Sequence, residues 1–198
     1  MGSKRGAQVR RVDSSGGGSR RTYIIIGLIA AVFIAGFATL VILDARQNAM
    51  STPPDGVQTY DVGPAGQHTE ANVNYKQNPP VGGSHNPVWQ NCGYYDQPVH
   101  DENAVHSLEH GAVWITYSPD LPQDEVERLR DIAENETYVL VSPRDGLPSP
   151  VVASAWGKQL RLDDAEDSDL ERFIGAYEQG PQTPEKGAVC TGGIGQPV

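Results

Sequence analysis

The segment AVWITY at residues 112–117 indicates the fold class more clearly than any other part of the chain. Its β-branched and aromatic residues are typical of a β-strand. Residues 119–135 follow directly and read as an amphipathic helix. The stripe on one face of that helix consists of Val126, Leu129, Ile132 and Ala133. A strand that leads into a helix indicates a domain that combines both kinds of element.

Further elements are predicted toward the C-terminus. TYVLVS (137–142) and VVASAW (151–156) are strand-like, and residues 158–163 alternate as a strand that turns back at Gly157. A second helix then starts at a capping box formed by Ser168 and Glu171. These elements predict an α+β fold, a single small domain with an antiparallel or mixed sheet and two helices on one sheet face.

Residues 23–43 predict a transmembrane helix. They carry no charge and are nearly all Ile, Leu, Val, Ala, Phe and Gly. A helix of this length spans about 31 Å, the thickness of the hydrocarbon core of a bilayer. A cleaved signal peptide is the alternative. The apolar region of a signal peptide is usually shorter than residues 23–43, and the small-residue cleavage site that should follow it is not evident after Leu43. We therefore expect an uncleaved anchor.

Charge predicts the orientation of that anchor. Residues 1–22 contain six basic residues and one acidic residue, so the positive-inside rule places the N-terminus in the cytoplasm. Residues 44–198 contain nine basic and 24 acidic residues. An acidic surface repels nucleic acid, so we expect no nucleic-acid partner.

The chain is therefore predicted to have four parts. Residues 1–22 form a disordered cytoplasmic tail, 23–43 the transmembrane helix, 44–56 a linker and 57–198 an extracytoplasmic α+β domain of the cell membrane. Small residues recur at every fourth position of the span, which would let a second helix pack closely. A helix–helix dimer or a protein partner in the membrane is one hypothesis for these residues, Gly27, Ala31, Ala35 and Thr39.

Cys92 and Cys190 are the only cysteines of the chain. The predicted topology places both in an oxidising compartment, where an even number of cysteines favours a disulfide. The bond would close a loop of about 100 residues, which is worth about 4–5 kcal/mol in the chain-entropy model. The open alternative is a copper site that uses a cysteine.

Histidines supply the main biochemical clue. The segment HSLEHG (106–111) places His106 and His110 four residues apart, which is one face of a helix. His85 lies near Cys92, in a loop that the disulfide would hold rigid. Imidazoles together with a carboxylate can hold copper or zinc. The predicted metal ligands are His85, His106, Glu109 and His110, with Asp101 and Glu102 as further oxygen ligands or supporting partners.

Two other interpretations stay open. The spacing H-x-x-E-H matches the inverzincin proteases, in which Glu109 would act as the general base of a small zinc hydrolase. Gly111 and the strand after it, however, end the helix too early for that arrangement. The histidines can also be purely structural hydrogen-bonding groups in an accessory module that docks on a membrane complex without metal. We assign no catalytic residue, and metal binding is the first hypothesis.

Three segments resemble a known bacterial family. They are GGSHNPVWQNCG (82–93), NAVHSLEHGAVW (103–114) and PVVASAWG (150–157). Together they are similar to the family catalogued as domain of unknown function 3105, and the resemblance covers most of residues 57–195. It implies an N-terminal membrane anchor and an extracytoplasmic domain, and it implies no activity. The predicted ligands all fall within these segments.

Overall fold

The computed structural model describes residues 19–198, the side chains of residue 19 and residues 46–50 excepted. The predicted basic tail, residues 1–22, therefore lies outside the described residues except for its last four. The chain separates into two compact units, residues 1–45 and 46–198, and each is described by itself.

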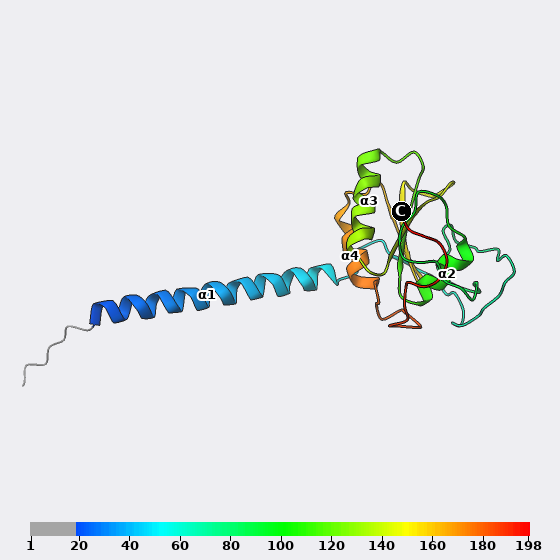
Figure 1. The fold of residues 1–198 in the computed structure, drawn as a ribbon. Coiled ribbons are helices and arrows are strands. Elements are labelled where there is room, and N and C mark those ends of the chain that lie inside the picture. The colour runs from blue at the N-terminus through cyan, green and yellow to red at the C-terminus, as the bar shows by residue number, and fades with distance from the viewer. Residues whose placement is uncertain (1–18) are drawn as a thin grey trace, which may run out of the picture. The chain divides into compact units, whose positions relative to one another are not determined.

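The first unit is dominated by one helix, α1 (Ser19–Met50), drawn in blue in Figure 1. Its segment Arg20–Ala45 is long and apolar enough to cross a membrane. The helix is longer than the predicted span 23–43 and takes in the first half of the predicted linker. Residues 44–50 contain good helix formers such as Ala, Arg, Gln and Met, and the helix ends shortly before Pro53 and Pro54.

The second unit is built on a mixed six-stranded sheet, as the predicted α+β class requires. The strand order is β1-β6-β5-β3-β4-β2. β3 pairs in parallel with β4 and antiparallel with β5, and β5 and β6 form the hairpin predicted around Gly157. The strands are β1 (Gln58–Thr59), β2 (Gly93–Tyr94), β3 (Val113–Tyr117), β4 (Val139–Pro143), β5 (Val151–Ala155) and β6 (Lys158–Leu162).

Helices cover both faces of this sheet. α3 (Gln123–Asn135) and α4 (Ser168–Tyr177) pack on one face, and α2 (Asp101–Glu109) lies on the other (Figure 1). The two predicted helices therefore lie on one face as expected, and α2 is an additional helix on the other face. The apolar pattern of the sequence did not predict α2, because much of the buried surface of this helix is polar, including Asn103 and Ser107.

The central strand β3 divides the core in two. Side chains alternate along a strand, so Val113 and Ile115 join the core beneath α3 and α4, while Trp114 joins the core beneath α2. All five residues of β3 are buried. Burial on both faces explains why AVWITY is continuously apolar or β-branched rather than alternating with polar residues.

Both predicted helix starts needed correction. α3 begins at Gln123 rather than 119, because Pro122 is tolerated next to the first turn but not inside the helix. α4 begins at Ser168, but its N-cap is Asp167, whose Oδ1 accepts from Asp169 N at 2.9 Å. The predicted capping-box partner Glu171 instead accepts a hydrogen bond from Arg128 at 3.0 Å.

Asp167→Ala is expected to lower the free energy of unfolding by about 1 kcal/mol, because the N-terminal amides of α4 lose their acceptor. Ser168→Ala is the matched control and should leave stability within about 0.5 kcal/mol, since its exposed side chain caps nothing in the described structure. Denaturant unfolding of both variants checks this. A larger loss for Ser168→Ala would contradict the assignment of the cap.

Candidate metal centre

The predicted histidines gather on the α2 side of the sheet. His106 and Glu109 lie on the last turns of α2, and the chain leaves that helix through Gly111. Gly111 has φ +98°, a backbone conformation that favours glycine, and a Cβ there would also displace the Gln179 side chain, whose Nε2 would lie 2.5 Å away. Because the chain turns sharply at Gly111, the helix ends there. The polar C-terminal end of α2 therefore faces two loops.

Those two loops bring further imidazoles to α2. The segments around His68 and His85 form a parallel bridge, in which Thr69 N donates to His85 O at 2.7 Å and His85 N donates to Gln67 O at 3.0 Å. The bridge places the two imidazoles edge to face, with ring centroids 4.9 Å apart. Segments with no regular secondary structure are thereby fixed against the helix.

Four side chains converge in what we call the inner site: His68, His85, His106 and Glu109. One ligand atom from each lies within 4.8 Å of the others. The side chains of His85 and Glu109 are fully buried, whereas that of His68 is 42% exposed. The structure thus brings together three of the four predicted ligands and adds His68, which the sequence analysis did not include.

The imidazoles are oriented by backbone carbonyls. A carbonyl oxygen can only accept, so each bonded Nδ1 must carry the proton. In the neutral ring, Nε2 then holds a free lone pair, as in the metal-ligating histidines of many proteins. The pairs, each at 2.7 Å, are His85 with Gly83, His106 with Asn86 and His110 with Val189.

The contact between His85 and Glu109 needs a positive charge. His85 Nε2 lies 2.9 Å from Glu109 Oε2, yet neither atom has a hydrogen-bond partner among the described residues. With the proton of His85 on Nδ1, two lone pairs face each other in a buried place. Such an arrangement is unfavourable unless a positive charge lies between them.

Glu109 is held in position by its other oxygen. Oε1 accepts from Gly66 N at 2.6 Å, while Oε2 faces His85 and lies 3.9 Å from His68 Nε2. No lysine or arginine pairs with this carboxylate in the part of the chain that the structure describes. A fully buried carboxylate needs a positive charge nearby, from a protonated imidazole that faces it or from a bound cation.

His106 stays neutral at physiological pH. Burial lowers its pKa to about 4, against the opposing hydrogen bond to Asn86, and the neighbouring histidines lower it further. A neutral imidazole is the form that binds metal, so His106 is ready to act as a ligand.

His110 lies outside the inner site, in contrast to the prediction. Its Nε2 is 3.6 Å from Oε2 of Glu185, and these two residues form with His106 a second group whose ligand atoms lie within 4.8 Å of one another. Trp89 packs against this group, with its ring centroid 5.0 Å from that of His110 and 5.8 Å from that of His106. Glu185, near the C-terminus, carried no motif that could have revealed it.

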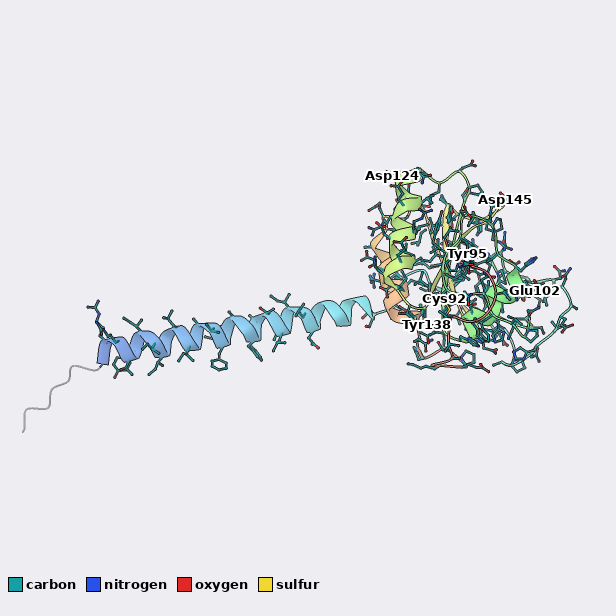
Figure 2. All side chains as sticks on the ribbon, viewed as in Figure 1. Cys92, Tyr95, Glu102, Asp124, Tyr138 and Asp145 are labelled. Carbon is teal, nitrogen blue, oxygen red and sulfur yellow. A yellow bond between two sulfur atoms is a disulfide. The ribbon has the colours of Figure 1, made fainter. Side chains whose placement is uncertain are left out.

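The two acids proposed as extra ligands have structural partners. Asp101 forms a two-pronged ion pair with Arg144, one contact of which is 2.9 Å. Glu102, labelled in Figure 2, accepts from Val73 N at 2.8 Å. Both interactions hold the start of α2 to neighbouring segments, and neither carboxylate belongs to a candidate metal group.

The disulfide between Cys92 and Cys190 is present, as predicted. It ties the C-terminal segment to residues 89–95, and backbone bonds such as Cys92 N to Cys190 O at 2.8 Å extend the attachment. Val189, whose carbonyl orients His110, is the neighbour of Cys190. The disulfide therefore supports the second group directly and rules out either cysteine as a free copper ligand.

Comparison with known proteins gives a family and no activity. The model of the family described as "Protein of unknown function (DUF3105)" matches residues 67–192, which include the histidines of both groups, Glu185 and both cysteines. Neither the curated proteins nor the solved structures give a match. Because the family model covers well over half of the chain, the protein belongs to the DUF3105 family.

Proposed function

We propose that this protein is a single-pass membrane protein whose extracytoplasmic domain binds one zinc or copper(II) ion at the inner site. The ligands are Nε2 of His68, His85 and His106 together with Oε2 of Glu109. The observation that carries the proposal is the 2.9 Å approach of His85 Nε2 to Glu109 Oε2, two buried acceptors without a partner. A divalent ion between them supplies the missing positive charge.

The donor set favours zinc or copper(II) over copper(I). Three imidazole nitrogens and one carboxylate oxygen are borderline to hard ligands, whereas copper(I) prefers thiolates and thioethers. Both cysteines are in the disulfide, and the candidate groups consist of histidines and glutamates.

The number of ligands favours holding an ion over hydrolysis. Catalytic zinc sites keep one coordination position open for water. Sites with four protein ligands have no open position, and they store the metal, carry it or stabilise the fold. In this proposal Glu109 is a ligand and is not available as the general base of an inverzincin-like hydrolase. The domain would therefore act as a metal-holding module of the membrane surface rather than as an enzyme.

The chain also supports the proposed orientation. The basic residues before the span favour a cytoplasmic N-terminus, and the disulfide and the acidic composition of residues 44–198 suit an oxidising exterior. An extracytoplasmic site of this kind would take up its metal outside the cell.

Metal analysis of the full-length protein in detergent tests the proposal. The wild type should bind about one zinc or copper ion per chain, and His85→Ala and His106→Ala should each weaken that binding by at least about 100-fold, because each removes a direct ligand. His100→Ala is the matched control, since His100 is exposed at the start of α2 and caps nothing. A wild type that binds neither metal would refute the site.

A further inference from the structure

We propose that His106, His110 and Glu185 form an outer site, through which the ion reaches and leaves the inner site while bound to the shared ligand His106. This inference rests on the proposed metal binding and extends it to the route of the ion. It concerns a second group of ligands that the inner site does not use, and it assigns a role to Glu185, close to the C-terminus of the chain.

The outer site contains two different types of ligand at different depths. The side chain of Glu185 is 48% exposed, while that of His110 is only 5% exposed, and the two ligand atoms are 3.6 Å apart. Glu185 N also donates to the carbonyl of Glu109 at 3.0 Å, which fixes the segment that carries the exposed carboxylate beside α2. A hydrated cation can therefore meet Glu185 in solvent and His110 just beneath it.

His106 connects the two sites because it has only one free nitrogen. Its Nδ1 is bonded to Asn86 O at 2.7 Å, so only Nε2 can bind metal. The His106 ring lies between the others, with its centroid 4.6 Å from that of His110 and 4.8 Å from that of His85. One lone pair serves one ion, so the two sites cannot both be filled with His106 as a ligand.

The transfer is an exchange of ligands without redox chemistry. The ion keeps its bond to His106, loses Glu185, His110 and bound water, and gains the ligands of the inner site, with its charge and oxidation state unchanged. The inner site is the tighter one, because it offers four protein ligands instead of three and its carboxylate is fully buried. Because Glu185 is exposed, an ion binds to the outer site and leaves it faster than it does at the inner site.

The competing route passes His68, whose side chain is 42% exposed. The two routes make different kinetic predictions. If the ion passes through the outer site, altering Glu185 changes the rates of loading and release together and leaves the affinity alone, because Glu185 is not a ligand in the final complex. If the ion passes His68, Glu185 has no effect on either rate.

Stopped-flow mixing of metal-free full-length protein in detergent with Co²⁺, followed by visible absorption, distinguishes these routes. Glu185→Gln should slow loading and release by about tenfold each, the lower end of what local charge does to association rates, and Glu185→Lys should slow them further. The dissociation constant should match that of the wild type. The matched controls are Glu134→Gln and Glu134→Lys, which make the same charge changes at an exposed position of α3.

The outcomes separate the two proposals. Slower loading with unchanged affinity supports the outer site. Loading at the wild-type rate in both Glu185 variants overturns it while the inner site stands, and two cobalt ions per chain overturn the sharing of His106. A wild type that binds no cobalt removes the inner site, and the outer site with it.

Discussion

Glu109→Gln is expected to make the metal-free protein more stable and to abolish the stabilisation that metal gives the wild type. The glutamine Oε1 can still accept from Gly66 N, and its amide nitrogen would take the place of Oε2, 2.9 Å from His85 Nε2. A donor would then face the lone pair of His85. The new hydrogen bond and the lost charge should raise the melting temperature of the apoprotein by about 3 °C.

The same substitution removes the response to metal. Metal at a thousandfold excess over its dissociation constant stabilises the wild type by about 4 kcal/mol, or about 10 °C in melting temperature for a domain of this size. An amide nitrogen that donates to His85 cannot bind the ion, so the melting temperature of Glu109→Gln should not change with added zinc. Thermal unfolding with and without zinc measures both effects.

The sign of the first effect distinguishes a metal site from a buried ion pair. If a proton on His85 joined the two residues, Glu109→Gln would leave a buried charge without its partner and destabilise the apoprotein by about 3–5 kcal/mol. Glu102→Gln is the control on the same helix, because Glu102 accepts from Val73 N and faces no histidine lone pair in the described structure. It should retain the full response to zinc.

Replacing both Cys92 and Cys190 with Ala should lower the free energy of unfolding by about 4–5 kcal/mol, the loop-closure entropy of a cross-link across a separation of 98 residues. The loss comes from the freer unfolded chain and from the released C-terminal segment. Denaturant unfolding under oxidising conditions measures it, and the reduced wild type should behave like the double variant.

The double variant should affect the two groups of ligands differently. Val189, next to Cys190, orients His110, so the outer site should lose its order. The inner site is held by α2 and by the bridge between His68 and His85, none of which includes a cysteine. We therefore expect the folded double variant to keep its equilibrium affinity for zinc, and a large loss of affinity would contradict this division of the site.

Local patterns predicted the parts of the site that lie close together in the sequence. His106 and Glu109 are three residues apart on one helix, and helical periodicity alone places them on neighbouring turns. His68 and Glu185 carried no such signal, because they lie in irregular segments. The place of His110 in a different candidate group has the same origin, since helical spacing shows that two side chains share a face and not which third residue meets each of them.

The sequence by itself determined the apolar run of α1, the strands β3 to β6 and the cysteines that pair. The helix and the strands follow from hydrophobic periodicity and side-chain shape, which depend on only a few neighbouring residues. The disulfide follows from the number of cysteines, which does not depend on where they lie. Only the tertiary structure decided that His85 Nε2 lies 2.9 Å from Glu109 Oε2 in a buried place and that His106 belongs to two candidate groups. Those facts depend on backbone carbonyls that orient the rings and on loops joined by long-range pairing, and neither leaves a repeating pattern in the sequence.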